Sequence, residues 1–254
     1  MDCTVMGIVN VTPDSFSDGG KFFKPEEAFK RARNLVEEGA EIIDLGGEST
    51  RPGSTPLAWD EEWSRLEPVM KLIADKGLGR SVAISVDTYH PETAERAVAA
   101  GAKIVNCVYA TPVKDMLGIC EREGAELVFP FRFKGTAQGG EALFEIPKTD
   151  VPLYLDPMVG FGTTREEDLA LLGSVPAMAK LGRVLVGASR KRIVKKLTGE
   201  KVAGKNAGGS VGIALWAALH GASVVRVHDV GETVQAMKTF AACDSVIPNA
   251  DAHI

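Results

Sequence analysis

Short apolar runs alternate with longer amphipathic segments along the whole chain. The apolar runs contain almost no polar positions, which is typical of parallel strands covered on both faces. The strands that this pattern predicts are Val5–Val9, Ile42–Leu45, Val82–Val86, Ile104–Asn106, Leu127–Phe131, Leu153–Leu155, Val184–Gly187 and Val224–Val227.

The amphipathic segments between these runs predict helices. Pro25 with Glu26 and Glu27 behind it indicates one helix start, and several segments end in glycine, which favours the left-handed cap. Pro68 is expected to kink the helix that contains it. The predicted helices are Lys24–Glu38, Trp59–Lys76, His90–Ala100, Pro112–Glu123, Glu166–Leu181, Lys191–Leu197, Ser210–His220 and Gly231–Ala242.

This alternation predicts the fold class α/β, as an eight-stranded parallel (β/α)₈ TIM barrel that forms one domain over residues 1–254. A doubly wound open sheet is the alternative, but it does not explain why polar residues follow nearly every strand. The fifth crossover, between Phe131 and Leu153, is short, and three glycines and Pro147 interrupt it. We therefore expect a shortened fifth crossover that lacks a full helix.

Charge and cysteine content exclude several classes of protein. The net charge of -5 argues against a nucleic-acid or membrane partner, and no apolar run reaches membrane-spanning length. Four cysteines without paired spacing predict a reducing compartment and no zinc site. The N-terminus runs directly into a strand without a basic region, so we expect no signal peptide and a cytoplasmic protein.

Polar residues at or just beyond the predicted strands converge on one face if the fold is a barrel. Buried carboxylates accept the donors of a polar heterocycle, and an amide can both donate and accept. For Asp87 and Asp156 the alternative is strand-end caps or ion pairs with Arg190 or Lys191. The convergent set is Asn10, Asp44, Glu48, Asp87, Asn106, Arg132, Asp156, Lys191, Arg226 and His228.

Three residues of this set and Phe161 suggest what else the face could hold. Arg226 and His228 alternate and so point to the same side, where a guanidinium and an imidazole suit a diphosphate. Asn10 offers a neutral oxygen to Mg²⁺, which usually keeps several waters and binds substrate phosphates. Phe161 is a candidate to stack on a flat ring, with plain core packing as the alternative.

Six sequence blocks resemble, in the same order, the signatures of the dihydropteroate synthases, a family of pterin-binding enzymes. They span nearly the whole chain. The blocks are MGIVNVTPDSFSDGG (Met6–Gly20), IIDLGGESTRPGS (Ile42–Ser54), SVDT (Ser85–Thr88), LDPMVGFGTT (Leu155–Thr164), GASRK (Gly187–Lys191) and RVHDV (Arg226–Val230).

The resemblance implies a cytoplasmic transferase of folate biosynthesis that uses Mg²⁺, binds small-molecule substrates, forms a homodimer and is a sulfonamide target. It would condense hydroxymethyl-dihydropterin pyrophosphate with para-aminobenzoate to give dihydropteroate and pyrophosphate. The implied residues are Asp87, Asn106, Asp156, Phe161 and Lys191 for the pterin, Asn10, Arg226 and His228 for pyrophosphate, Asn10 for the metal, Thr50, Arg51, Pro52 and Ser189 for para-aminobenzoate, and Asp87, Asp156, Lys191, Arg226 and His228 for catalysis. The loops 12–20 and 49–56 would close over para-aminobenzoate, which is expected to bind after the pterin pyrophosphate.

Three features depart from the family pattern. Cys107 stands where an acidic residue is usual, and Phe131-Arg132-Phe133 replaces a segment that usually carries histidine. The third is the shortened fifth crossover, where the family normally has a full helix. We expect Phe131 to give the pterin an apolar wall and Arg132 to face the site. These departures favour one alternative, a non-catalytic pterin-binding paralogue. A second alternative is a pterin-dependent methyltransferase, which would share the barrel and the pterin aspartates but would have no use for the ESTRP loop or the RVHD block.

Overall fold

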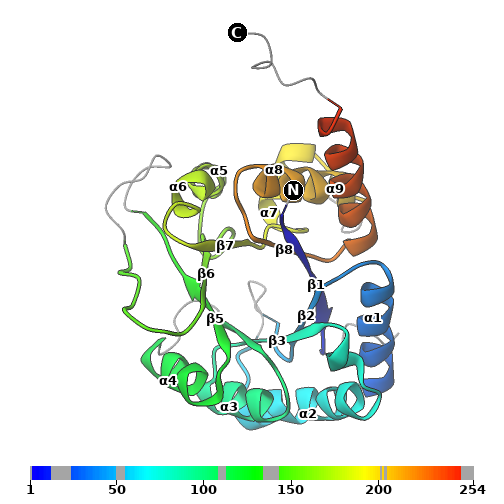
Figure 1. Ribbon diagram of the computed structural model, residues 1–254, viewed down its shortest axis with the longest axis vertical. Helices are drawn as coiled ribbons and strands as arrows, with labels where there is room; N and C mark the ends of the chain where they lie inside the picture. The colour runs from blue at the N-terminus through cyan, green and yellow to red at the C-terminus, as the bar shows by residue number, and fades with distance from the viewer. Residues whose placement is uncertain are drawn as a thin grey trace.

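The protein is a closed eight-stranded parallel barrel, in which each strand pairs with the next along the chain and β8 pairs with β1 (Figure 1). The computed structural model describes residues 2–12, 24–49, 55–107, 113–133, 143–200, 202 and 205–246. Every predicted strand is present within two residues of its expected bounds. The strands are β1 (Thr4–Asn10), β2 (Ile42–Gly46), β3 (Ala83–Thr88), β4 (Ile104–Cys107), β5 (Glu126–Pro130), β6 (Leu153–Asp156), β7 (Arg183–Val186) and β8 (Val224–Val227).

Helices surround the barrel on the outside (Figure 1). The glycines predicted to end helices do so in the left-handed region, as with Gly39 at φ 107° and Gly101 at φ 108°. The helices are α1 (Pro25–Glu37), α2 (Trp59–Asp75), α3 (Pro91–Ala99), α4 (Val113–Glu123), α5 (Arg165–Gly173), α6 (Val175–Met178), α7 (Arg192–Thr198), α8 (Ala207–Leu219) and α9 (Val230–Asp244), with a 3₁₀ turn at Leu78–Arg80.

The segment after β6 differs from its prediction. One helix was expected over Glu166–Leu181, but the chain forms α5 and then the single turn α6, with Ser174 between them. Pro176 explains the break, because it lies in the first turn of α6 and has no backbone N–H with which to continue the hydrogen bonds of α5. The helix α2, by contrast, continues through Pro68.

The connection between β5 and β6 contains no helix in its described residues, 131–133 and 143–152. This agrees with the shortened crossover predicted there. Leu143 and Phe144, on this connection, are 48% and 44% exposed. The helix α4 packs on β5, but the described part of the connection from β5 to β6 adds no helix to the barrel wall (Figure 1).

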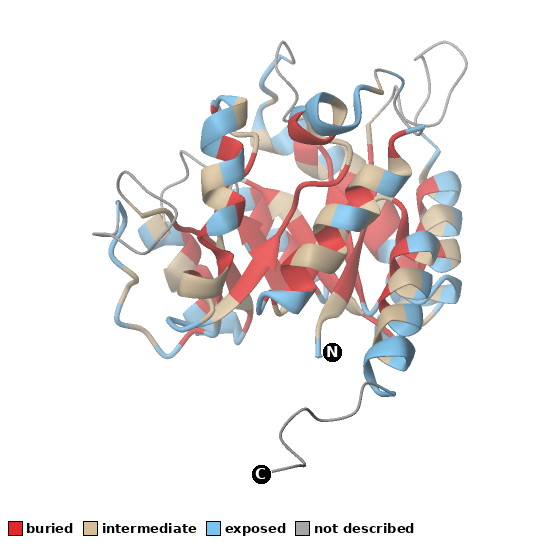
Figure 2. Cartoon of the chain, turned by 90° about the horizontal axis from the view of Figure 1, so that it is seen from above, coloured by how far each residue is buried: buried red, intermediate tan, exposed pale blue. Residues whose placement is uncertain are grey.

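Apolar side chains form two separate layers, one inside the barrel and one between strands and helices. Figure 2 shows the strands as the most buried part of the chain. The inner layer consists of Met6, Ile42, Ile104, Val128, Tyr154, Leu185 and Val224. Because alternate residues of a strand share a face, residues two or four positions beyond this layer also point into the barrel.

This parity places the polar strand residues. Asp44 lies two residues after Ile42, Asn106 two after Ile104, and Arg226 two after Val224. All three therefore lie on the inward face, toward the carboxyl end of the strands. Phe131 has the opposite parity: it is buried in the outer layer, where its ring packs edge-on against Phe133 at 5.2 Å between centroids. The expectation that Phe131 lines the ring pocket is wrong.

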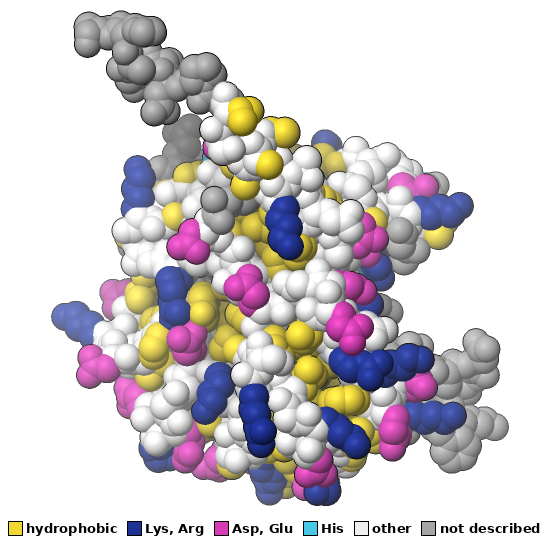
Figure 3. Space-filling model, turned by 45° about the vertical axis from the view of Figure 1, so that its right-hand side comes forward, with side chains coloured by type: hydrophobic (Ala, Val, Ile, Leu, Met, Phe, Trp, Pro, Cys, Tyr) yellow, Lys and Arg dark blue, Asp and Glu magenta, His cyan; other side chains and the backbone are white. Residues whose placement is uncertain are grey.

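Charges of both signs are mixed on the face of the molecule that Figure 3 presents. Figure 3 shows lysine and arginine side chains interspersed with aspartate and glutamate over the face that it presents. Among the described residues, no helix is both long enough and apolar enough to cross a membrane.

Candidate active site

Four inward-facing side chains form a buried polar cluster where β2, β3, β4 and β8 end. Arg226 lies at its centre and donates from Nε to Asp44 Oδ2 at 2.6 Å and from Nη2 to Asp87 Oδ2 at 2.5 Å. Asn106 donates from Nδ2 to Asp44 Oδ2 at 3.1 Å. We call these residues (Asp44, Asp87, Asn106 and Arg226) the strand cluster.

Burial controls the protonation of the strand cluster. The Asp87 side chain is 13% exposed and that of Arg226 is 16% exposed. Burial raises the pKa of Asp87 to about 7, even though the positive charge of Arg226 opposes the shift. Burial alone would lower the pKa of Arg226, but the Asp44 and Asp87 carboxylates raise it above its ordinary value, so the guanidinium stays charged.

The loop after β6 carries a second set of predicted residues. Asp156 accepts from the backbone N–H of Met158 at 2.7 Å, and burial raises the pKa of its carboxyl group. Asp168, from α5, accepts from the N–H of Gly160 and from the hydroxyl of Thr163, at 2.7 Å and 2.5 Å. Two carboxylates therefore fix the loop in one shape, with Met158 in the left-handed region at φ 62°.

Lys191 joins the β6 loop to the strand cluster. Its Nζ donates to the carbonyl of Val159 at 2.6 Å and lies 4.3 Å from the centroid of the Phe161 ring. Burial lowers the pKa of Lys191 to about 8, while the charges of Asp156 and Asp87 oppose this shift. A Cβ at Gly160, where φ is 82°, would lie 2.9 Å from Lys191 Cδ, so glycine leaves room for the lysine.

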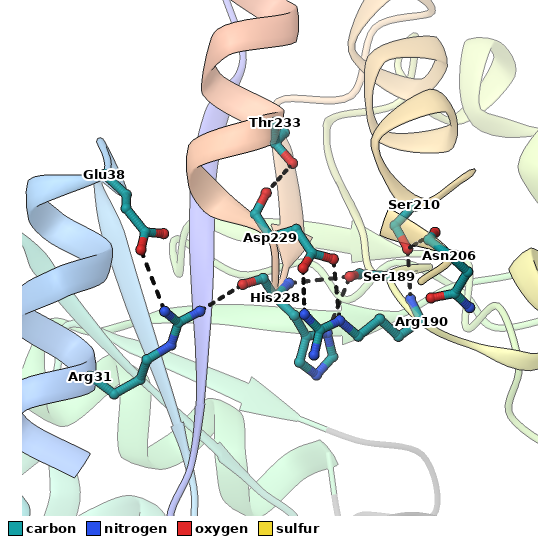
Figure 4. Close-up of polar contacts among 9 residues, drawn as sticks. All are labelled: Arg31, Glu38, Ser189, Arg190, Asn206, Ser210, His228, Asp229 and Thr233. Carbon is teal, nitrogen blue, oxygen red and sulfur yellow. Dashed lines mark hydrogen bonds and ion pairs between the residues drawn. The ribbon is translucent and has the colours of Figure 1, made fainter. Parts of the chain in front are cut away.

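At the edge of the mouth, Ser189 and His228 contact each other across the loops after β7 and β8 (Figure 4). The Ser189 hydroxyl lies 3.1 Å from His228 Nδ1, and Ser189 Oγ accepts from the backbone N–H of His228 at 3.2 Å. The backbone carbonyl of His228 accepts from Arg31 Nη2 at 2.8 Å. The structure thus brings together one residue predicted for para-aminobenzoate and one predicted for pyrophosphate.

The next residue on each loop makes a parallel connection. Arg190 donates from Nε to Asp229 Oδ2 at 3.2 Å and from Nη2 to the other carboxylate oxygen (Figure 4). Arg190 has φ 58°, and its N–H donates to Ser210 Oγ at 3.0 Å. We call Ser189, Arg190, His228 and Asp229 the loop clasp, because two adjacent pairs hold the two loops together.

The remaining predicted residues are less closely connected. Asn10 ends β1 and is paired in register with Gly46. Arg132 donates to the carbonyl of Phe161 at 3.2 Å, and its positive charge acts to lower the pKa of Asp156 against the larger effect of burial. The residues predicted for para-aminobenzoate on the second loop, Thr50, Arg51 and Pro52, lie outside the described residues, as do residues 13–20 of the first loop.

Three structurally important residues had no assigned role in the sequence interpretation of the site. Asp44 was predicted to converge on the mouth but without a particular role; it is buried at 0% exposure inside the apolar strand IIDLG, a setting in which a carboxylate usually has a partner. Asp229 follows His228 in the RVHDV block. Asp168 lies in an acidic first helical turn, a pattern that ordinarily indicates only a helix start, so no separate signal marked it as part of the site.

TIM-barrel enzymes bind their substrates at the carboxyl ends of the parallel strands, and this is where the buried, charged side chains of this protein lie. The fold and the site therefore define an enzyme of that class. The chain matches the model of the family described as pterin binding enzyme over residues 6–141 and 142–228, and it belongs to this family.

The relatives that the chain resembles are dihydropteroate synthases. It is 37% identical over 254 residues to the dihydropteroate synthase of Bacillus subtilis, covering 92% of this chain and 86% of that protein. The dihydropteroate synthase of Xanthomonas albilineans solved with 4-aminobenzoic acid superposes with a TM-score of 0.82 at 36% identity, over 96% of this chain and 94% of the other. The same enzyme in complex with 7,8-dihydropteroate gives a TM-score of 0.80 at 33% identity, over 96% and 95%.

Proposed function

We propose that this protein is a dihydropteroate synthase, a transferase that joins hydroxymethyl-dihydropterin pyrophosphate to para-aminobenzoate. The observation that carries the proposal is the convergence of Asp87, Asn106, Asp156 and Lys191 beside the positive charge of Arg226. Carboxylates and an amide suit the donor-rich edge of a pterin, and cations suit its diphosphate. The named relatives support the same reaction.

The reaction needs no nucleophile from the protein. The amine nitrogen of para-aminobenzoate attacks the methylene carbon, the bond from that carbon to the diphosphate oxygen breaks, and the amine loses one proton. Pyrophosphate leaves with the bonding electron pair. Arg226 and His228 would stabilise the departing charge, and the carboxylates would hold the ring in line with the amine.

Lys191 and Asp156 would act on the pterin ring itself. Lys191 Nζ lies over the Phe161 ring and close enough to Asp156 and Asp87 for their charges to raise its pKa against burial. Its ammonium would donate to a ring acceptor, while Asp156 would accept a ring N–H. Phe161, in contact with this ammonium, is placed to form one wall of the ring pocket.

Mg²⁺ is part of the proposal. Asn10 ends β1, and its oxygen is a neutral ligand of the kind that Mg²⁺ accepts when substrate phosphates and waters complete its shell. The described residues contain no group of three histidine, cysteine or acidic side chains suited to a metal, so the donor set fits an ion that arrives with the diphosphate. When bound, the ion would neutralise the leaving group.

Para-aminobenzoate would bind at the loop clasp through Ser189, with Thr50, Arg51 and Pro52 proposed from the sequence. Because Ser189 contacts His228 at 3.1 Å, the second substrate would lie next to the diphosphate site. We propose that the pterin pyrophosphate binds first and para-aminobenzoate second. Sulfonamides, which mimic para-aminobenzoate, would then bind and inhibit only when pyrophosphate is present. Tight sulfonamide binding without pyrophosphate would contradict the order.

A cytoplasmic homodimer completes the proposal. Leu197, Val202 and Leu219 are 44%, 52% and 45% exposed near the ends of α7 and α8, which suits burial against a second copy. Sedimentation analysis at micromolar protein should give a mass of two chains.

The deciding assay mixes the protein with hydroxymethyl-dihydropterin pyrophosphate, para-aminobenzoate and Mg²⁺, and measures dihydropteroate and pyrophosphate together. Equal amounts of the two products are expected, and neither should form when para-aminobenzoate is omitted. Arg226→Gln serves as the impaired comparison. Pterin binding without product would favour a non-catalytic paralogue, and the absence of any pyrophosphate binding at millimolar ligand would refute the synthase proposal.

A further inference from the structure

Asp44 is the most deeply buried charged residue of the strand cluster, and it faces no solvent. It is 0% exposed, and its Oδ2 accepts from both Arg226 Nε at 2.6 Å and Asn106 Nδ2 at 3.1 Å. Its Oδ1 is buried without a hydrogen-bond partner in the structure. Burying a carboxylate costs free energy. Asp44 offsets this cost by its contacts with Asn106 and Arg226, and it constrains both of these side chains.

The first effect concerns the Asn106 amide, whose two ends have opposite hydrogen-bonding properties. A carboxylate oxygen can only accept, so the NH₂ end of Asn106 must face Asp44. The carbonyl oxygen is then turned away from Asp44. The negative charge of Asp44 therefore determines which end of the Asn106 amide faces it. One of the two N–H bonds of Asn106 is thereby used by Asp44, and the amide cannot exchange the places of its nitrogen and oxygen without losing that bond. The acceptor that Asn106 can offer a ligand is its carbonyl oxygen, on the side away from Asp44.

The second effect concerns Arg226, which uses different nitrogens for its two carboxylates. Nη2 contacts Asp87, and Nε contacts Asp44. A ligand that takes Asp87 as its acceptor displaces only the Nη2 contact. Asp44 therefore keeps the guanidinium at the edge of the pocket after the ring has bound.

We propose that Asp44 is a positioning residue that sets the strand cluster to recognise a ring edge rich in donors. This inference rests on the proposed function, because the pterin is the ring in question. With the carbonyl oxygen of Asn106 turned away from Asp44, the pocket offers acceptors from β3, β4 and β6: Asp87, Asn106 and Asp156. A 2-amino ring satisfies them with N–H groups, whereas a 2-oxo ring presents an oxygen to an acceptor.

The test measures discrimination between these two rings. Dissociation constants for 6-hydroxymethylpterin and 6-hydroxymethyllumazine, which carries oxygen in place of the 2-amino group, are determined by calorimetry. A site built to receive an N–H rejects the analogue strongly, so we expect wild type to favour the pterin by about 100-fold or more. Asp44→Leu, which has a similar volume and no acceptor, should reduce that ratio at least about tenfold, because Asn106 can then turn its NH₂ toward the lumazine oxygen. Asp44→Asn keeps one acceptor and should lie between them.

Ser85→Ala is the matched control, since Ser85 pairs in register with Asp44, is equally buried and has no place in the proposed site. It should leave the ratio unchanged. The exchange Asp44→Asn with Asn106→Asp restores an amide donor facing a carboxylate and should recover the ratio relative to Asp44→Asn alone.

The outcomes separate the two proposals. If wild type binds neither ring, the proposed function and this inference both fall. If wild type discriminates but the Asp44 variants weaken both ligands equally, the ratio is unchanged, and Asp44 has only a structural role. Should Asp44→Leu not fold, the Asp44→Asn ratio and its recovery in the exchange variant decide the inference alone.

Discussion

The strand cluster and the loop clasp lie at the same mouth but are built differently. The strand cluster comes from β2, β3, β4 and β8, and its charges are buried: Asp44 is 0% exposed and Arg226 16%. The loop clasp comes from the loops after β7 and β8, and Arg190 in it is 34% exposed. In the strand cluster both members of each ion pair are largely buried, whereas the ion pair of the loop clasp joins a buried carboxylate, Asp229, to a partly exposed guanidinium. This difference implies that the two regions will respond differently to the same kind of substitution.

The largest difference is expected in stability. Arg226→Ala leaves the Asp44 and Asp87 carboxylates buried without their cation, so the free energy of unfolding should fall by about 3–5 kcal/mol. Arg190→Ala removes a cation that is 34% exposed but leaves the buried Asp229 carboxylate without this partner. Because only one member of the pair is buried, the loss should be smaller, about 1–2 kcal/mol. Urea denaturation at pH 8 measures both. Equal losses would show that the two regions do not differ in burial as described.

Pterin affinity should depend on residues in the inner part of the mouth, such as Asp156, and not on the loop clasp at its edge. Asp156→Ala removes an acceptor from a buried site, and a charged hydrogen bond contributes roughly 1.5–3 kcal/mol, which is about ten- to a hundredfold in pterin affinity. Calorimetry with the pterin measures this. The control is Asp229→Asn in the loop clasp, which should bind the pterin as wild type does. A wild-type affinity in Asp156→Ala would remove Asp156 from the pterin site.

The pH dependence follows from the two shifted groups of the inner mouth. Asp87, with a pKa of about 7, must be ionised to accept ring donors, and Lys191, with a pKa of about 8, must be protonated to donate. Pterin affinity should therefore be highest between about pH 7 and 8 and fall up to about tenfold per unit outside that window. Lys191→Arg should abolish the alkaline decline, because arginine stays charged. A flat profile from pH 5 to 9 would contradict these assignments.

Ionisation of Asp87 has opposite effects on the two properties: as pH rises through its pKa, pterin affinity increases but the stability of the free protein decreases. The pKa of Asp87 in the folded protein lies above its ordinary value of 3.8, so its contribution to stability is complete below about pH 4 and is lost as pH rises through 7. From this group alone, the free protein is therefore more stable at pH 5 than at pH 8, where the pterin binds better. Asp87→Asn should remove both trends together, which thermal unfolding and calorimetry across pH can measure.

The smallest effect is expected in the loop clasp. Ser189→Ala removes the one neutral hydrogen bond that we propose between Ser189 and para-aminobenzoate. The KM for para-aminobenzoate should therefore rise about two- to tenfold, while pterin affinity is unchanged. Steady-state kinetics with each substrate varied in turn distinguishes the two. Ser189→Thr, which keeps the hydroxyl, is the conservative comparison. If Ser189→Ala instead weakened the pterin, the inner site and the edge of the mouth would not be separate.

The sequence by itself determined the barrel and most of the inward-facing residues. Continuous apolar runs define parallel strands, and the two-residue period of a strand decides which side chains share a face with the inner core. For this reason the inward positions of Asp87, Asn106 and Arg226 could be predicted without coordinates. The same period shows why the expectation for Phe131 failed, since it shares the face of Phe129 in the outer layer. The break at Ser174 also has a local cause, in Pro176.

Only the tertiary structure decided which polar side chains contact one another. Asp44 and Arg226 are 182 residues apart in the chain, and Ser189 and His228 are 39 apart. No local pattern encodes such pairs, because they form only when β8 closes against β1 and neighbouring loops meet at the mouth. Asp44 could therefore be recognised from the sequence as a buried carboxylate, but its contacts with both Asn106 and Arg226 follow from closure of the barrel.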